Sequence, residues 1–382
     1  MSKTSFLRQA IADIPHAYHG AIDFAELEAW GISPDDILDF SVNSNPFGHE
    51  ETVREAIANA PLHRYPDKEC LALRRALVDH LGLDDIGQIL VGNGTAELLW
   101  LICFATLEPG DTVLILEPTF GEYGRMVQLM GGRVIAHRAS ESADFLFDVN
   151  AVATHLTQEQ PKLCFLCNPN NPTGGVVNPQ EIGRWADAHP QTLFIIDEAY
   201  LNFTQNLTSV IALKRPNILS LRSMTKDYAL AGLRLGYVAG DNLLIRGIGS
   251  AKVPWSVNEL AQQAGTAVLS LHNHFKQDWE KLDQTANDFR NKLCQLSLIP
   301  NPSQTHFFLL PVGDGQAFRQ HMLRHGILVR LAESYQLPHM VRVATQTPEM
   351  NERFLTAVST YANLPKPNQE QKLLVRLRNE KL

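Results

Sequence analysis

The sequence lacks any long uninterrupted apolar stretch. Its longest apolar runs, such as residues 98–106, are far shorter than the ~20 residues that a membrane-spanning helix needs. Residues 1–10 show neither the apolar core nor the small-residue cleavage pattern of a secretory signal peptide. Positive charge is also limited, because 33 Lys and Arg face 41 Asp and Glu, giving a net charge of −8 without a basic stripe. We therefore expect neither a membrane nor a nucleic-acid partner, but a cytoplasmic enzyme with a small-molecule substrate.

Cysteine is scarce as well. The chain has 5 cysteines, an odd number without even spacing, which does not describe a disulfide framework. Cys164 and Cys167 form a C-x-x-C pattern that could indicate redox or zinc chemistry, but they lie in an apolar run typical of a buried strand. Positions three apart on a strand point to opposite faces, so we expect the two thiols to pack separately in the core. No other cluster suggests a metal site, and we expect none.

What the chain does contain is a regular alternation of short apolar runs and helical stretches. The runs expected to form strands are residues 88–91, 111–116, 133–137, 163–167, 193–196, 218–221 and 235–238. This alternation predicts an α/β fold whose largely parallel sheet is covered by helices on both faces. In such sheets ligands bind at the carboxyl ends of the strands, and the motifs described below all follow such a run.

The C-terminal third follows a different pattern. A long helical stretch at 263–294 precedes apolar runs at 307–310, 327–330 and 340–344, with a helix near 317–325. Strands and helices without strict alternation predict a smaller α+β domain. We therefore expect a large ligand-binding domain at 41–250 and a small C-terminal domain at 251–364. Residues 1–40 would form an N-terminal arm that joins the small domain, and 365–382 a loosely attached tail.

Lys226 lies in the most informative segment. A lysine attacks a carbonyl compound only in a site that favours its neutral amine. Ser223 and Thr225 precede Lys226, and Arg234 follows beyond a turn of small residues. These residues could hold an aldehyde cofactor that carries a phosphate. Alone, such a Ser/Thr-Lys pair is more typical of a surface loop, so the interpretation depends on the other segments.

A glycine-containing turn at 92–97 indicates an anion site. It follows an expected strand and opens the apolar helix at 98–106, so Gly94, Thr95 and Ala96 would place free amides and the positive end of the helix against an anion. Glu97 replaces the third glycine of the dinucleotide fingerprint, so a dinucleotide is not indicated. Taken alone, a turn of this kind often binds nothing.

Two further strand ends carry polar side chains. The loop 168–175 has three asparagines, two X-Pro bonds and a Gly-Gly exit, which predict a rigid loop whose amide can donate to a phenolate-type oxygen. Asp197 ends an apolar run, and a buried Asp needs a cationic or donating partner such as a protonated pyridine nitrogen. Tyr200 could reach a ring hydroxyl from the next turn. The alternative for Asp197 is a helix-capping role. Together, the four segments meet the requirements of pyridoxal 5′-phosphate.

With these motifs the chain resembles the fold-type I pyridoxal-phosphate enzymes of the class I/II aminotransferase superfamily, in the subgroup of histidinol-phosphate aminotransferase and threonine-phosphate decarboxylase. The resemblance covers roughly residues 38–357 and includes segments 39–46, 64–67, 118–123, 168–174, 197–200, 223–237, 254–258 and 341–344. It implies a large domain with a mixed, mostly parallel sheet, a smaller α+β domain, and a homodimer that binds an amino acid.

The resemblance also implies a role for each matching position. Lys226 would form the Schiff base with the cofactor and move the substrate α-proton, Asp197 would pair with the pyridine nitrogen, and Tyr200 would hold the ring oxygen. The remaining cofactor-binding positions would be Gly94, Thr95, Ala96, Phe120, Asn171, Ser223, Thr225, Arg234 and, from the neighbouring subunit, Tyr65. The substrate-binding positions would be His19, Asn43, Arg330 and Arg342.

Few residues distinguish the two relatives. His19, Ser41 and Asn43 resemble the decarboxylase, and Ser44 stands where the aminotransferase usually has an acid, whereas Ala21 and Glu333 depart from the decarboxylase pattern. We therefore expect a threonine-phosphate decarboxylase-like enzyme that acts on a small phosphorylated or anionic amino acid. The alternative is a histidinol-phosphate-type aminotransferase. A further alternative is elimination or cyclisation of an amino acid in specialised metabolism.

Overall fold

The computed structural model of the protein describes residues 11, 14 and 20–361 of the 382-residue chain. The expected tail at 365–382 therefore lies outside the described residues. Within them, no helix is both long enough and apolar enough to cross a membrane.

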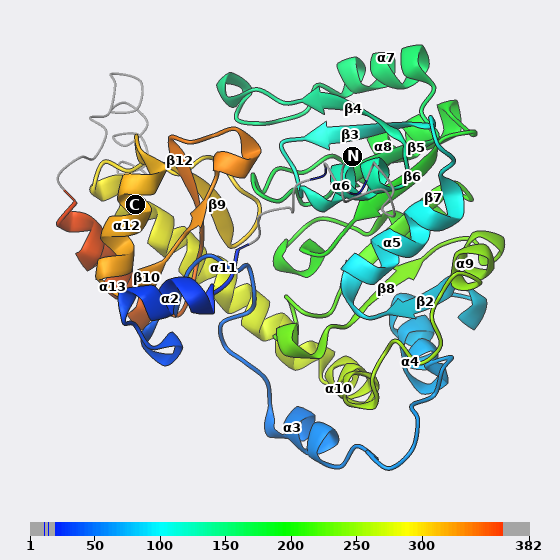
Figure 1. Ribbon diagram of the computed structural model, residues 1–382, viewed down its shortest axis with the longest axis horizontal. Coiled ribbons are helices and arrows are strands. Elements are labelled where there is room, and N and C mark those ends of the chain that lie inside the picture. The colour runs from blue at the N-terminus through cyan, green and yellow to red at the C-terminus, as the bar shows by residue number, and fades with distance from the viewer. Residues whose placement is uncertain (1–10, 12–13, 15–19, 362–382) are drawn as a thin grey trace, which may run out of the picture.

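The larger part of the molecule is built on a seven-stranded mixed sheet in the order β2-β8-β7-β6-β5-β3-β4 (Figure 1). Its strands are β2 (Ile89–Gly92), β3 (Thr112–Glu117), β4 (Arg133–Arg138), β5 (Leu163–Cys167), β6 (Leu193–Asp197), β7 (Ile218–Ser223) and β8 (Gly236–Ala239). β8 runs antiparallel to both of its neighbours, and the other pairs are parallel. The expected α/β fold with a mostly parallel sheet is therefore confirmed.

Both faces of this sheet are covered, which explains the continuous apolar strands. The sheet carries α5 (Gly94–Thr106), α6 (Glu122–Leu129), α7 (Val149–Glu159), α8 (Pro179–Ala188) and α9 (Asn242–Gly249). Cys164 of β5 packs in the cluster that α7 and α8 complete, whereas Cys167 packs in the cluster of α5 and α6 on the other face. Both thiols are buried and free, as the spacing of three predicts.

Three helices lie beside the edge of this sheet that carries β2. They are α3 (Glu51–Ala58), α4 (Leu71–Leu81) and α10 (Glu259–Ser270), and α10 packs against the other two. The expected single helix at 263–294 is wrong in one respect, because α10 ends before Leu271 and α11 (His272–Gln295) follows it. The apolar pattern continues through this bend, so the sequence does not mark it.

The smaller part has two short sheets and its own apolar core. β9 (Phe307–Pro311), β11 (Arg330–Leu331) and β12 (Met340–Ala344) form an antiparallel sheet, and β1 (Leu38–Asp39) pairs in parallel with β10 (Ile327–Leu328). The surrounding helices are α2 (Phe24–Trp30), α12 (Gly315–Arg324) and α13 (Pro348–Ser359), and α11 runs from the region of α10 to this part (Figure 1). The expected strand 327–330 is divided at Val329, where the chain leaves β1 and joins β12.

Candidate active site

A cavity of about 810 Å³ lies at the carboxyl ends of β5, β6 and β7, where the two parts of the molecule meet. Cys167, Asp197 and Ser223 end these strands and line it, and Arg330 and Arg342 line it from the smaller part. The positions singled out from the sequence that line the cavity are Asn43, Thr95, Ala96, Phe120, Asn171, Asp197, Tyr200, Ser223, Thr225, Lys226, Arg234, Arg330 and Arg342. The structure therefore brings together residues from eight separate segments of the chain.

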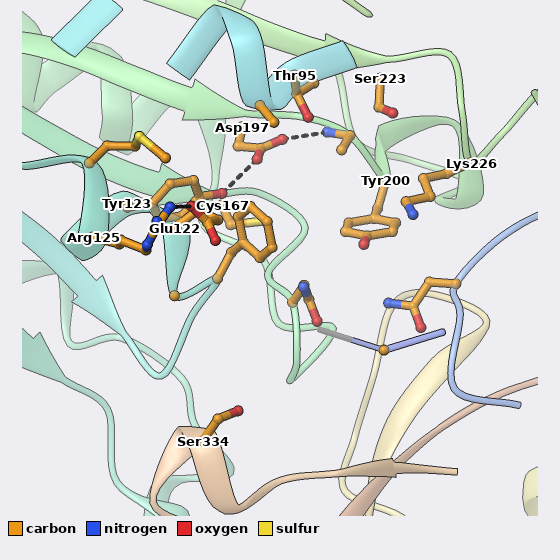
Figure 2. Close-up of a pocket in the computed structure, with 18 of the residues that line it drawn as sticks. Thr95, Glu122, Tyr123, Arg125, Cys167, Asp197, Tyr200, Ser223, Lys226 and Ser334 are labelled. Carbon is orange, nitrogen blue, oxygen red and sulfur yellow. Dashed lines mark hydrogen bonds and ion pairs between the residues drawn. The ribbon is translucent and has the colours of Figure 1, made fainter. Parts of the chain in front are cut away.

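Lys226 extends into this cavity beside Tyr200 (Figure 2). Its own carbonyl accepts a hydrogen bond from the Asn45 amide at 2.8 Å, which fixes the main chain at this point. Burial lowers the pKa of the Lys226 amine to about 8, and the charges of Arg342 and Arg234 act in the same direction. A larger fraction of Lys226 is therefore neutral near physiological pH than for an ordinary lysine, as a carbonyl-attacking amine requires.

Asp197 ends β6 with its side chain in the cavity, and the residue is only 6% exposed. Its Oδ1 accepts a hydrogen bond from the Ala199 amide at 3.0 Å, and its Oδ2 accepts one from the Tyr123 hydroxyl at 2.6 Å (Figure 2). Burial raises the pKa of Asp197, while the Tyr123 hydrogen bond opposes that shift. Each oxygen of Asp197 thus accepts one hydrogen bond from the protein, and the carboxylate has further lone pairs that could accept one from a protonated nitrogen in the cavity.

Tyr123 is a site residue that the sequence did not single out. It lies on α6, is fully buried, and its ring stacks on Phe165 at 5.1 Å. The available signal was its position at the end of segment 118–123, which the resemblance already included. Because the hydroxyl donates to Asp197, Tyr123 orients this carboxylate and stabilises its ionised form.

The start of α5 and the end of β7 form an anion cradle. The first-turn amides of a helix have no partner within the helix, and Thr95 and Ala96 occupy that turn. The hydroxyl oxygens of Ser223 and Thr225 lie 2.7 Å apart on the other side. Arg234 completes the set as the cation.

Gly94 does not line the cavity itself, but the cradle depends on it. Its φ is +77°, a conformation that glycine adopts readily. A Cβ at this position would stand 2.8 Å from Nη2 of Arg234. The absence of a side chain therefore allows Arg234 to approach the end of the helix, which is a steric role rather than direct ligand contact.

The loop after β5 contributes one of its three asparagines to the cavity. Asn168 exchanges two hydrogen bonds with the main chain of Val177, and Asn170 binds Thr119 and the Pro118 carbonyl. Of the three asparagines only Asn171 lines the cavity, and it is the one expected to bind the ring oxygen. Oδ1 of Asn171 accepts a hydrogen bond from Arg342, which leaves its NH2 group as the edge that can donate to a ligand.

Two buried arginines form the wall that the smaller part contributes. Arg330 and Arg342 are 2% and 5% exposed. Arg330 donates to the Ser334 hydroxyl at 2.9 Å, and Arg342 donates to Asn171 and to the Ser41 carbonyl. Since buried cations require partners, this wall is suited to an anionic group of a ligand.

Asn43 shows that the cavity is adapted to a ligand. The residue is 1% exposed, and neither atom of its carboxamide completes a hydrogen bond within the described part of the chain. Its side chain lies near the Tyr200 hydroxyl, in a contact too loose for a full hydrogen bond, which lowers the pKa of Tyr200 while burial raises it. A buried amide of this kind calls for a polar partner, and a ligand in the cavity would supply it.

Tyr65 is an expected site residue that does not line the cavity of its own chain. Tyr65 is 77% exposed and packs against Trp255, with ring centroids 4.9 Å apart and the ring planes tilted by 31°. His19 lies outside the described residues, although its neighbour Gly20 lines the cavity. A Cβ at Gly20 would stand 3.2 Å from Nη2 of Arg342, so the chain passes very close to the arginine wall.

The cavity has the donor set that pyridoxal 5′-phosphate needs. Asp197 would pair with a pyridinium nitrogen, Asn171 and Tyr200 would donate to a ring oxygen, and the α5 cradle would hold the phosphate. The side chain of Lys226 supplies the amine. The buried carboxamide of Asn43, which has no full hydrogen bond within the described residues, is an independent sign that a polar group belongs here.

The chain matches a family model, Aminotransferase class I and II, over residues 35–358. It belongs to this family. A histidinol-phosphate aminotransferase of Akkermansia muciniphila is 32% identical over 358 residues, which are 92% of this chain and 98% of the relative. The enzyme is therefore an aminotransferase-family member throughout its length rather than in one segment.

Two solved structures share the fold. A histidinol-phosphate aminotransferase from Sinorhizobium meliloti, solved in complex with pyridoxal-5′-phosphate, has a TM-score of 0.82 at 24% identity, covering 93% of this chain and 97% of that one. An L-threonine-O-3-phosphate decarboxylase from Porphyromonas gingivalis has a TM-score of 0.75 at 27% identity, covering 84% and 98%.

These findings overturn the expectation of a threonine-phosphate decarboxylase-like enzyme. Further relatives at 31% and 32% identity carry the same aminotransferase name as the Akkermansia protein, whereas the decarboxylase is one more distant structural neighbour. The expectation depended partly on Ser41, which has a structural role here. Its hydroxyl donates to Asp39 at 2.6 Å and its carbonyl accepts from Arg342, so Ser41 positions the arginine wall and does not indicate the reaction.

Proposed function

We propose that this protein is a histidinol-phosphate-type aminotransferase, which transfers the amino group of a phosphorylated amino alcohol to a 2-oxo acid. The observation that carries the proposal is the pair of buried arginines, Arg330 and Arg342, in the same cavity as Lys226. Bidentate arginine contacts suit phosphate, and two arginines together suit a dianion. Full-length relatives named histidinol-phosphate aminotransferase support the same substrate.

The cofactor is pyridoxal 5′-phosphate, and the cavity residues would divide its binding between them. When bound, its pyridine ring supplies an electron sink for the charge that develops at the substrate Cα. Asp197 would hold the ring nitrogen protonated, with Tyr123 orienting the carboxylate through its 2.6 Å hydrogen bond. Asn171 and Tyr200 would donate to the ring oxygen, and Phe120 would pack against the ring face.

Lys226 would carry out the proton transfer. Its low pKa, about 8, leaves enough neutral amine for Nζ to accept the proton from the substrate Cα. The arginine wall would hold the phosphate of the substrate, which fixes the orientation of the Cα–H bond toward Nζ. Asn43, whose amide lacks a partner, would bind a polar group of the substrate or the cofactor.

The direct test is to incubate the purified enzyme with L-histidinol phosphate and 2-oxoglutarate and to measure glutamate. We expect glutamate to form in proportion to consumed histidinol phosphate. Transamination of other amino donors, with none of histidinol phosphate, would overturn the substrate assignment and leave the family assignment in place.

We also propose a homodimer in which Tyr65 reaches the cavity of the partner subunit. The support is the exposed pair of aromatic rings of Tyr65 and Trp255, because large exposed apolar groups mark interaction sites. Trp100, which is 44% exposed, borders the cavity and would be covered in the same contact. Sedimentation velocity at micromolar concentration tests the assembly directly.

For location, we propose the cytoplasm. The support is that all five cysteines are buried and free, which suits a reducing compartment. Fractionation of cells that produce a tagged protein would test this.

A further inference from the structure

Asp197 and Lys226 are each followed in sequence by a buried acid. Glu198 is 1% exposed and Asp227 is 3% exposed, and neither lines the cavity. Between them lies Arg222 of β7, which is 6% exposed. Ser223, next to it on the strand, faces the cavity, so Arg222 points to the opposite face. A buried charged cluster therefore lies directly behind the two residues expected to do the chemistry.

A continuous set of polar contacts connects these groups. Nη1 of Arg222 lies 3.7 Å from Oε2 of Glu198, and its Nη2 donates to Oδ1 of Asn202 at 3.1 Å. Nδ2 of Asn202 donates in turn to Oδ2 of Asp227 at 2.7 Å. Asn202 lies in the short helical turn η4 (Leu201–Phe203) that follows Tyr200. The sequence Glu198–Arg222–Asn202–Asp227 thus links the segment of Asp197 and Tyr200 to the segment of Lys226.

The main chain at Lys226 is held by the same region. The carbonyl of Asp227 accepts hydrogen bonds from Nε1 of Trp279 at 3.0 Å and from Nδ2 of Asn45 at 3.3 Å. The carboxylate of Asp227 also accepts from the amide of Tyr228 at 3.0 Å. Asp227 is therefore bound through both its main chain and its side chain, and the position of the adjacent Lys226 Cα depends on these contacts.

The orientation of Asn202 is fixed by its two neighbours. An arginine can only donate and a carboxylate can only accept, so the Asn202 oxygen must face Arg222 and its nitrogen must face Asp227. Burial raises the pKa of Asp227 to about 7, and the Arg222 charge is the main influence that opposes this shift. With Asp227 ionised, the cluster therefore has one defined arrangement of donors and acceptors.

We infer that Asp227 is a positioning residue, which acts through Asn202 and Arg222 to hold Lys226 in a fixed relation to Asp197. The inference concerns the amine of Lys226 and does not depend on which amino donor the enzyme uses. It requires that the effect of Asp227 comes from this specific contact with Asn202, not merely from filling the site.

The first variant is Asp227→Asn, which has nearly the same shape but offers one acceptor oxygen to two donors, the Tyr228 amide and Nδ2 of Asn202. We expect the turn at Lys226 and Asp227 to become less rigid and the Lys226 amine to become better hydrated. The pKa of Lys226 should then rise by about one unit toward the ordinary lysine value. Two measurements report this. One is the pH dependence of Lys226 acylation in the cofactor-free protein, followed by mass spectrometry, and the other is the pH midpoint of the cofactor absorbance in the loaded protein.

The decisive variant exchanges the two side chains, as Asn202→Asp together with Asp227→Asn. This double variant keeps the formal charge and the number of hydrogen bonds, because the new carboxylate accepts from Arg222 and from the new amide. We expect both midpoints to return to the wild-type values. Asn202→Asp alone removes the donor to Asp227 and should shift the midpoints as Asp227→Asn does.

The control is Asp187→Asn, which makes the same chemical change in an exposed ion pair with Arg215. It should leave both midpoints unchanged. A purely structural cluster would lower the melting temperature of the single variants without moving the Lys226 midpoints, and that result would overturn the inference. If Asp227→Asn does not fold, the double variant still decides: folding with wild-type midpoints supports the inference, and any other outcome contradicts it.

Discussion

Arg330 of β11 and Arg342 of β12 are direct cross-strand partners, and both are almost fully buried. Like charges directly opposite each other destabilise a sheet. Each arginine donates a hydrogen bond to a neutral side chain, Arg330 to Ser334 and Arg342 to Asn171. Binding of an anionic ligand by the two arginines would explain the arrangement, although the paired charges lower the stability of the ligand-free protein.

This relationship predicts opposite effects of Arg330→Met on binding and stability. The KM for histidinol phosphate should rise about 10- to 100-fold, because a charge-assisted contact to the phosphate is lost. The melting temperature of the ligand-free protein should stay equal or rise, since one of two facing charges is gone. Histidinol without the phosphate serves as the control substrate and should show little change. A lower melting temperature with an unchanged KM would contradict the assignment of the wall.

Lys226 is expected to be the residue that carries the cofactor. Borohydride reduction of the loaded enzyme followed by peptide mapping should place the pyridoxyl group on Lys226 and on no other lysine. Lys226→Ala should still bind the cofactor weakly through the α5 cradle, while turnover falls by several orders of magnitude. A pyridoxyl group on another lysine would show that the assignment is incorrect.

Asp197→Asn should reduce turnover far more than it reduces cofactor affinity. A neutral amide does not keep the pyridine nitrogen protonated, whereas the phosphate contacts that supply much of the affinity remain. Tyr123→Phe removes only the 2.6 Å hydrogen bond to Asp197 and should cause a smaller loss in the same direction. Turnover is measured at saturating cofactor, and affinity by the quenching of protein fluorescence. Near-normal turnover of the Asp197→Asn enzyme would show that the electron sink is set elsewhere.

The pKa of Lys226 predicts how stability of the cofactor-free protein depends on pH. The pKa of Lys226 is about 8 in the folded protein and 10.5 for an ordinary lysine. Below pH 8 the buried amine is protonated and lowers the free energy of unfolding, and this loss of stability disappears as the pH rises to 10.5. Lys226→Met should therefore stabilise the cofactor-free protein at pH 7, by at most about 3 kcal/mol and less if the amine is hydrated in the cavity. The difference from wild type should vanish near pH 10.5. Urea unfolding at both pH values tests this, and a pH-independent difference would contradict it.

The strands of the large sheet could be predicted from the sequence, and the contacts between them could not. Runs such as 163–167 are apolar throughout and end at prolines or polar clusters, so their limits are marked locally. The pairing of Arg330 with Arg342 depends on the register of two strands, which the sequence does not encode locally. The hydrogen bond from Tyr123 to Asp197 joins residues 74 positions apart and requires the fold to be known.

The site residues show the same limit. Lys226, Asp197 and the turn at Gly94 each follow a strand, so the sequence placed them at one edge of the sheet. The sequence could not show that Asn43 is buried without a partner, or that Asn168 and Asn170 hold the loop while Asn171 lines the cavity. The substrate was assigned incorrectly because the choice depended on His19 and Ser41. One lies outside the described residues, and the other supports Arg342 through its carbonyl.

The proposed dimer predicts that one active site is built from two subunits. Tyr65 is 77% exposed and does not line the cavity of its own chain, so its loss should affect only the site of the partner. Tyr65→Ala and Lys226→Ala should each be poorly active as homodimers. A heterodimer with one subunit of each kind contains one site with both Tyr65 and Lys226 and one site with neither.

Heterodimers purified with two different affinity tags should therefore recover about half of the wild-type turnover, because one of two sites is intact. Leu243→Ala provides a control, since Leu243 is 75% exposed on α9 and does not line the cavity. Mixing this variant with Lys226→Ala should give the same half activity without any need for complementation. If verified Tyr65→Ala/Lys226→Ala heterodimers show no recovery, then Tyr65 acts within its own chain or not at all, and the composite site must be abandoned.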